Sequence, residues 1–325
     1  MLRAVTWVFG TTIAVSCAST LAQQPENYPS RLIRMIVPQP AGGTTDALGR
    51  FVSQIITEAT RQQVVVENRG GAGGNIGTEI VAKARPDGYT LLTVASSTLT
   101  INPSLFAKMP YDTVQDLAPI VTLAEVPNVL VAHPSLPVHN VRELIKLAKA
   151  KPGMLNYGSS GSGQSSHLAM ELFKTMADVR IVHIPYKGGS QLVIDVIAGH
   201  VLLMMNNITT ALPHIKAGKL RALGVTSLKR SPAMPELVTI DEGGLKGFEN
   251  SVWYGLLAPA GTPAPIISRL NAIVVKALHT PEMRERLSNQ GAEPVGNSPE
   301  ESAAQLRTDL AKWAEVIKET GAKLD

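Results

Sequence analysis

RLIRMIVPQPAGGTTDALGRFVSQII, residues 31–56, is the stretch that decides the fold. It opens with an apolar run that ends in prolines, which predicts a buried strand. A loop rich in glycine and threonine follows, and then Leu48, Phe51, Val52 and Ile55 recur at helical spacing. The stretch therefore predicts a strand, a flexible loop and an amphipathic helix in direct succession.

The same alternation of strands and helices continues along the chain. In the first part we expect strands at 64–68 and 89–95 and a helix at 78–84. In the second part we expect helices at 141–150, 165–176 and 190–199, and strands at 154–158, 179–186, 201–206 and 220–226. The helix at 165–176 places Ala169, Leu172, Phe173 and Met176 on one face. This pattern predicts two α/β units with mainly parallel sheets, one on each side of about Val126.

The C-terminal part of the chain is predicted to return to the first unit. A strand is expected at 251–261, and three helices follow it, each preceded by Thr or Ser and then proline. Ser298 and Glu301 also fit a capping box at the last of these helices. We therefore expect a discontinuous first lobe, residues 23–125 and 251–325, and a second lobe, residues 126–250. Two chain crossings form a hinge, and the cleft between two lobes is where small ligands usually bind.

The N-terminus has the pattern of an export signal. Arg3 precedes an apolar and small-residue run to about Val15, and small residues then lead to Ala22. This predicts a signal peptide, residues 1–22, with cleavage near Ala22 and a periplasmic mature protein. The run is too short to span a bilayer. Cys17, the single cysteine, lies inside this segment, so a lipid anchor there stays open, whereas disulfides and cysteine chemistry are excluded from the mature chain.

Composition narrows the class of partner. The 325 residues carry a net charge of +4, with scattered Lys and Arg and only 4% aromatic residues. Nucleic acid is therefore not an expected partner, although a mild positive field suits a small anion. The seven histidines show no metal-ligand spacing, so no metal and no cofactor are predicted.

Three loops rich in Gly, Ser and Thr follow predicted strands and precede predicted helices. They span 38–46, 68–77 and 157–167. Ligands of open parallel sheets bind at this position, and the free N–H groups at a helix start favour an anion. The first and third loops, one on each lobe, are predicted to form two halves of an anion cradle.

Each of these features also has a structural explanation. Glycine-rich loops often only make tight turns, and Thr44, Thr45 or Ser165 could simply cap helices. Asp46 would repel an anion, so it either stabilises the helix start or accepts a hydrogen bond from a ligand donor. His167 is more typical of a packing residue than of a catalytic base, and Lys187 could face the cleft or the solvent.

Several catalytic motifs are absent from the sequence. Ile76 stands where the third glycine of a dinucleotide fingerprint belongs, and Gln164 replaces the lysine of a P-loop. No G-x-S-x-G elbow surrounds Ser160 or Ser162. A serine hydrolase that uses one of these serines with His167 remains an alternative without a supporting motif.

Five motifs of the chain resemble those of one family, in the same order. They are VPQPAGGTTDALGR (37–50), VENRGGAGGNIGTEIVAKARPDGYTLL (66–92), LNYGSSGSGQSSHLAMELF (155–173), IPYKGGSQLVIDVIAGHV (184–201) and YGLLAPAGTPAPIISRLN (254–271). This set resembles the Bug (TctC-type) extracytoplasmic solute receptors of tripartite tricarboxylate transporters, over nearly the whole mature chain. The resemblance implies a two-lobed Venus-flytrap receptor of the periplasmic-binding-protein type II fold.

The resemblance also implies a function and a site. Such receptors bind a small carboxylate or related polar metabolite and pass it to membrane permease subunits, and they are not enzymes. Carried over by motif, the binding residues are Gly43, Thr44, Thr45 and Asp46 on the first lobe and Ser159, Ser160, Gly161 and Ser165 on the second. Ser96, Ser97, Tyr186 and Lys187 are secondary candidates. We expect a monomer, and a receptor that feeds a signalling pathway rather than a transporter is the alternative.

The chain departs from the family pattern in two places. Pro40-Ala41 stands where two prolines are frequent, and Asn206 stands where an acidic residue is common. A neutral amide at 206 can donate to a ligand oxygen, which a carboxylate cannot do. Asn206 therefore joins the candidate binding residues, and the identity of the ligand stays open.

Overall fold

A mixed β-sheet that runs through the whole molecule organises the fold. The computed structural model describes residues 28–320, so the predicted signal peptide and Cys17 lie outside the described residues. The strand order is β2-β1-β3-β9-β4-β7-β5-β6, with β10 and β8 also paired to β4. The strands are β1 (Ile33–Val37), β2 (Val64–Asn68), β3 (Thr90–Ala95), β4 (Leu117–Ala132), β5 (Asn156–Ser159), β6 (Val182–Pro185), β7 (Leu203–Asn207), β8 (Arg221–Val225), β9 (Ser251–Pro259) and β10 (Glu293–Pro294).

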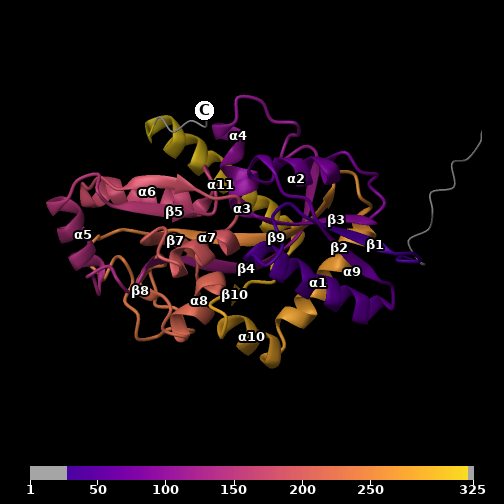
Figure 1. The fold of residues 1–325 in the computed structure, drawn as a ribbon. Coiled ribbons are helices and arrows are strands. Elements are labelled where there is room, and N and C mark those ends of the chain that lie inside the picture. Colours follow the sequence, from indigo (N-terminus) through magenta and orange to yellow (C-terminus); the bar gives the residue numbers. More distant parts are fainter. Residues whose placement is uncertain (1–27, 321–325) are drawn as a thin grey trace, which may run out of the picture.

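Helices cover both faces of this sheet (Figure 1). The helices are α1 (Thr44–Thr60), α2 (Asn75–Ala82), α3 (Ser96–Thr100), α4 (Asn102–Leu105), α5 (Val141–Ala150), α6 (Ser165–Ala177), α7 (Gly189–Ile197), α8 (Ile208–Lys216), α9 (Ala264–Leu278), α10 (Pro281–Ser288) and α11 (Pro299–Thr320), with a short 3₁₀ turn η2 (Ala72–Gly74). No helix in the described part of the chain is both long and apolar enough to cross a membrane.

The long strand β4 joins the two halves of the sheet. Its residues up to Pro127 pair with β9, and from Asn128 onward it pairs with β7 and β8. The parallel pairs lie farther out, where β1 lies between β2 and β3, and where β5 lies between β6 and β7. The predicted parallel α/β units are therefore present on both sides, and antiparallel strands connect them at the centre.

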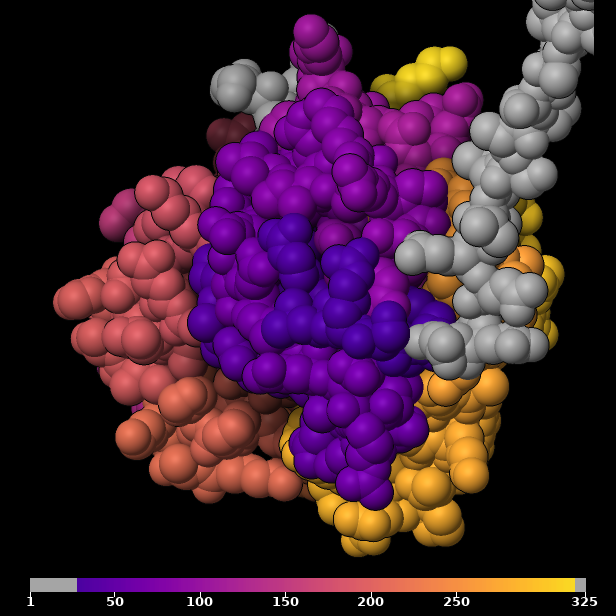
Figure 2. All heavy atoms as spheres, turned by 90° about the vertical axis from the view of Figure 1, so that its right-hand side faces the viewer, coloured from indigo at the N-terminus to yellow at the C-terminus, as the bar shows by residue number. Residues whose placement is uncertain are grey.

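The C-terminal segment packs on the N-terminal half of the sheet. β9 pairs with β3, and α9 contacts α1. Figure 2 shows the result on one face of the molecule: the indigo and purple surface of the N-terminal part borders the orange surface of the region of α9 and α10. The N-terminal half is thus built from two stretches of chain that are far apart in the sequence.

The amphipathic faces were predicted well for α1 and less well for α6. Leu48, Phe51, Val52 and Ile55 are all buried, as expected. On α6, Ala169 and Phe173 are fully buried, but the inclusion of Leu172 and Met176 in this face was wrong, because both are more than a third exposed. The side chain of Leu172 lines a groove between α6 and α11 instead of the core.

Candidate functional site

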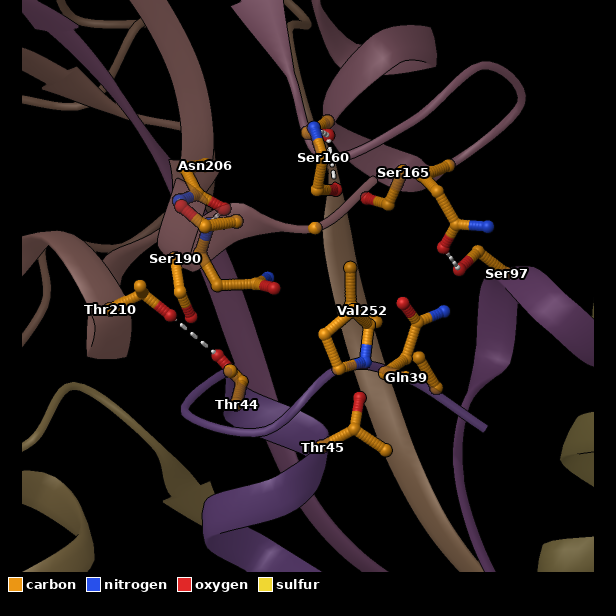
Figure 3. Close-up of a pocket in the computed structure, with 18 of the residues that line it drawn as sticks. Gln39, Thr44, Thr45, Ser97, Ser160, Ser165, Ser190, Asn206, Thr210 and Val252 are labelled. Carbon is orange, nitrogen blue, oxygen red and sulfur yellow. Dashed lines mark hydrogen bonds between the residues drawn. The ribbon is translucent and has the colours of Figure 1, made fainter. Parts of the chain in front are cut away.

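A cavity of about 110 Å³ lies between the two halves of the sheet. Its wall is formed by the loops that follow β1, β3, β5, β6 and β7, together with side chains of β9 (Figure 3). Because the first two loops belong to one half and the next three to the other, the cavity is an interlobe cleft. It lies at the carboxyl ends of the parallel strands, where the sequence placed a ligand site.

Four helices of eight or more residues begin at this cavity. Residues from the first turns of α1, α6, α7 and α8 form part of its wall. None of these four helices has a side-chain hydrogen bond that caps its N-terminus. The peptide N–H groups of the first turn and the positive ends of the helix dipoles are therefore directed at one small space. The wall contains no carboxylate, and Lys187 is its single charged side chain.

The hydroxyl groups at these helix starts do not act as caps. Thr44 and Thr45 were cap candidates, but the N-cap of α1 is Gly43, and both threonines lie inside the first turn. In α6 the N-cap is Gln164, and the Ser165 Oγ donates to the Asn250 Oδ1 at 2.8 Å. The capping prediction was therefore wrong, and the helix starts keep free N–H groups at the cavity.

On the first lobe, the cavity wall includes four of the six predicted residues. Gly43, Thr44, Thr45 and Ser97 form part of the wall. Ser96 instead lines the groove between α6 and α11.

Asp46 faces its own loop rather than the cavity. Its Oδ2 accepts the Gly42 N–H at 2.9 Å and the Arg50 Nε–H at 3.1 Å, and its Oδ1 accepts the Asn68 amide at 3.0 Å. Burial raises the pKa of Asp46, but the Arg50 guanidinium together with these hydrogen bonds lowers it below its usual value. The charge of Asp46 thus fixes the shape of the first loop.

On the second lobe, the cavity wall includes Ser160, Ser165, Lys187 and Asn206. The Ser160 N–H donates to the Ser166 Oγ at 3.0 Å, which holds the loop over the start of α6. The Asn206 amide is almost completely buried, and its Nδ2 donates to the Gly189 carbonyl at 3.3 Å. Gly161 and Tyr186 are not part of the wall. The Tyr186 hydroxyl donates to the Asp195 Oδ2 at 2.8 Å. Burial and this hydrogen bond raise the pKa of Tyr186 to about 12.

Ser159 belongs to a network behind the wall. Its Oγ lies 2.6 Å from the His183 Nε2, and the side chain is fully buried. The His183 ring stacks between Tyr157 and His167, with ring centroids 4.9 and 4.1 Å away. His167 Nδ1 in turn accepts the Gly163 N–H at 3.1 Å. The network therefore fixes the backbone of the loop 159–164.

Burial and the neighbouring His167 lower the pKa of His183 to about 4, and burial also lowers the pKa of His167. Both rings are consequently neutral at physiological pH. Neither ring forms part of the cavity wall, so the His167 base of the hydrolase alternative lies away from the site.

Other wall residues had no signal in the sequence. Gln164 stands where a P-loop would have a lysine, and Tyr254 lies on β9, far along the chain. The Tyr254 hydroxyl donates to the Asn207 Oδ1 at 2.7 Å, and burial raises the pKa of Tyr254. The glycines of the PYKGG segment, Gly188 and Gly189, start α7 at the wall, and only their position in a loop between a strand and a helix could have indicated this.

Two larger hollows are less suited to an anion. One, of about 680 Å³, lies between α6 and α11 and is lined by four carboxylates, those of Glu125, Glu171, Glu249 and Asp309. The other, of about 620 Å³, is formed mainly by residues 103–115 and is wide open. Unlike these two hollows, the smaller interlobe cavity combines helix N-termini with a wall that lacks negative charge.

Comparison with known proteins places the chain in a family. Residues 48–322 match the tripartite tricarboxylate transporter family receptor. The chain belongs to this family. Protein BugT of Bordetella pertussis is 40% identical to this receptor over 300 residues, which is 92% of each chain. The receptor therefore belongs to a family of solute-binding receptors, as the motifs indicated.

Solved structures agree with the two-lobed fold. Rpa4515 of R. palustris, solved with adipate, is 38% identical with a TM-score of 0.89, and the match covers 91% of this receptor and all of that chain. MatC from Rhodopseudomonas palustris, with bound malate, is 31% identical with a TM-score of 0.83, covering 89% of this receptor and all of that chain. The receptor thus has the type II periplasmic-binding fold.

Proposed function

We propose that this receptor captures a small carboxylate in the interlobe cavity. The observation that supports the proposal most directly is the convergence of four uncapped helix N-termini on a wall without carboxylates. Each terminus offers N–H donors and a partial positive charge to an anion. Serine and threonine hydroxyls and the Asn206 amide add neutral donors.

The size of the cavity limits the ligand. About 110 Å³ is well below the roughly 300–1,000 Å³ of sites for drug-sized molecules, so a metabolite with few carbon atoms fits best. The adipate and malate in the two related structures are small dicarboxylates of this kind. The predicted residues Gly43, Thr44, Thr45 and Ser97 would contact the ligand from one lobe, and Ser160, Ser165, Lys187 and Asn206 from the other. Asp46, Ser96, Ser159, Gly161 and Tyr186 would act indirectly, through the shape of the loops.

The ligand would bind between lobes that move as units. We propose lobes of residues 23–125 with 251–325 and of 126–250, with a hinge where β4 changes partner after Pro127. A ligand that contacts both lobes stabilises the closed arrangement by its differential contacts. The protein would act in the periplasm as a monomer after removal of residues 1–22, and would deliver its ligand unchanged to membrane permease subunits.

Calorimetric titration tests the proposal. Adipate and malate are titrated into the purified receptor, with adipamide as a control of similar shape but without charge. Binding of at least one diacid is expected, together with much weaker binding of the diamide, because hydrogen bonds to a charged acceptor are worth about 1.5–3 kcal/mol each. Equal affinity for acid and amide would refute an anion site. Mass spectrometry of compounds that co-purify with the receptor extends the test to other carboxylates.

A further inference from the structure

Gln164 connects the two lobes at one edge of the cavity. It is the N-cap residue of α6 on the second lobe, and its side chain is 7% exposed. Its Nε2 donates to the Gly73 carbonyl at 3.0 Å, and its Oε1 accepts a hydrogen bond from the Ser97 Oγ at 3.1 Å. Gly73 and Ser97 both follow strands of the first lobe, so one amide makes two bonds across the cleft.

A second connection lies at the opposite edge. The Thr44 Oγ1 on the first lobe lies 2.5 Å from the Thr209 Oγ1 and 3.2 Å from the Thr210 Oγ1 on the second lobe. Figure 3 shows Thr44 with Thr210 on one side of the cavity and Ser97 on the other. Protein groups alone therefore bridge the cleft on both sides of the space for the ligand.

We propose that Gln164 is a positioning residue that sets the balance between open and closed receptor. Its two bonds exist only when the lobes are together, so they stabilise the closed state before any ligand contributes. Because Gln164 and Ser97 also form part of the cavity wall, the residues that hold the lobes together also shape the ligand site. The expected change in ligand affinity rests on the proposed function, whereas the expected change in the shape of the ligand-free receptor does not.

The bonds of Gln164 can break without leaving a buried group unpaired on the first lobe. The Gly73 carbonyl also accepts hydrogen bonds from the Thr98 Oγ1 and the Asn102 Nδ2, each at 3.1 Å. When the lobes separate, these two donors still satisfy the carbonyl, and water can reach Gln164 and Ser97 in the open cleft. The cost of an unsatisfied polar group is thus avoided, and opening stays reversible.

Gly73 has the conformation that this contact requires. Its φ is 65°, in the left-handed region, and a Cβ atom there would lie 3.4 Å from the Gln164 Nε2. A side chain at 73 would therefore strain the backbone, and its Cβ would also lie 3.2 Å from the Asn102 Nδ2. Glycine allows the turn and keeps the approach to the carbonyl open.

The effect on affinity depends on the state of the free receptor. If the free receptor is mostly open, the loss of a closed-state contact weakens ligand binding by the full factor. If the free receptor is mostly closed, the loss of the same contact opens the free receptor. Ligand binding is then weakened less than in a receptor that was already open. Shape and affinity must therefore be measured together.

The test replaces Gln164 by methionine, which has a similar length but makes neither bond. Small-angle scattering of the ligand-free receptor and calorimetry with adipate and malate are compared between the parent and Gln164→Met. Gln54→Met is the matched control, because Gln54 is exposed on α1 and bonds only to Glu58 among the described residues. Urea unfolding confirms that each variant is folded.

We expect Gln164→Met to increase the radius of gyration of the free receptor, to weaken ligand binding about ten- to thirtyfold, or to do both. This range corresponds to two bonds of ordinary strength. Gln164→Glu still accepts from Ser97 but cannot donate to Gly73, so it should also favour the open state. Ser97→Ala and the double variant complete a mutant cycle, in which the two losses should not add.

Scattering and affinity of Gln164→Met equal to those of the parent would overturn the proposal, as would full additivity in the cycle. If Gln164→Met does not fold, Ser97→Ala, which removes one of the two bonds, is compared with the parent in its place. A more open Gln164→Met together with a parent that binds no carboxylate would support the role of Gln164 and refute the proposed function. If the parent and Gln164→Met bind a carboxylate equally well and have the same shape, the proposed function is supported and the role of Gln164 is refuted.

Discussion

Replacement of Gly43 by valine separates ligand binding from stability. Gly43 is the N-cap of α1, with φ −86° and ψ 174°, an extended conformation that valine adopts readily. A Cβ atom at this position meets only the Pro40 carbonyl, at 3.9 Å. The added side chain therefore does not collide with the protein, and it enters the space that we assign to the ligand.

The two effects of Gly43→Val differ in size. At an N-cap, valine is worse than glycine by up to about 1 kcal/mol, and the loss of a flexible glycine from the unfolded chain offsets about 0.4–1 kcal/mol of this. The free energy of unfolding should therefore change by less than about 1 kcal/mol. A carboxylate displaced from two N–H donors at the start of α1 loses about 3–6 kcal/mol, which is about a hundredfold to ten-thousandfold in affinity.

Calorimetry with adipate and malate, together with urea unfolding, measures both quantities on the same protein. Gly218→Val is a suitable comparison for a glycine in open space, although its φ of 70° makes that substitution costly to stability rather than to binding. Gly43→Val with parental affinity would show that the ligand does not approach the start of α1. A large loss of stability would show that the space beside Gly43 is not open to a side chain.

Three further predictions concern the second lobe. Ser160→Pro removes the N–H that donates to the Ser166 Oγ. Calorimetry should therefore show weaker ligand binding, and urea unfolding should show lower stability. Unchanged affinity would exclude this loop from the site. Lys187→Ala removes the single charge of the cavity wall and should slow ligand association in stopped-flow measurements, more at low than at high salt; equal rates at low salt would argue against attraction by Lys187. The pKa of His183 is lowered to about 4 in the folded protein from about 6.5 in the unfolded chain, so the unfolded state takes up a proton first. The free energy of unfolding should therefore fall as the pH drops through this interval, and His183→Asn should flatten the curve; identical curves would contradict the role of His183.

The strand–loop–helix units could be predicted because they depend on local pattern. The run at 33–37 and the spacing of Leu48 and Val52 report burial directly, whatever the rest of the chain does. The strand β4 could not be predicted as one element. Pro119 and Pro127 interrupt its sequence, and proline argues against a central strand. The pairing shifts near Pro119, and β4 changes partner after Pro127, so distant strands rather than local propensity decide its course.

The candidate site could be located from the sequence but not resolved into its contacts. The position of Gly, Ser and Thr residues between a strand and a helix indicated the loops at 38–46 and 157–167, but the similar loop at 68–77 contributes no residue to the cavity wall. This position could not show that Asp46 turns back to the Gly42 N–H, or that Ser159 lies behind the wall against His183. These directions depend on partners that are 4 to 24 residues away in the chain and become neighbours only in the folded protein.

Some helices of the chain have a side-chain cap at the N-terminus, and the four that begin at the cavity do not. At α5 the Asn140 Oδ1 accepts the Glu143 N–H at 2.9 Å, and at α11 Ser298 and Glu301 form a reciprocal capping box. These two helices have ordinary side-chain caps, whereas α9 and α10, which also begin away from the cavity, have none. At α1 the hydroxyl nearest to such a position, that of Thr44, instead bonds to the other lobe. Each cap left out forgoes about 1 kcal/mol of stability, and an anion that accepts the same N–H groups restores it only when the lobes are closed around it.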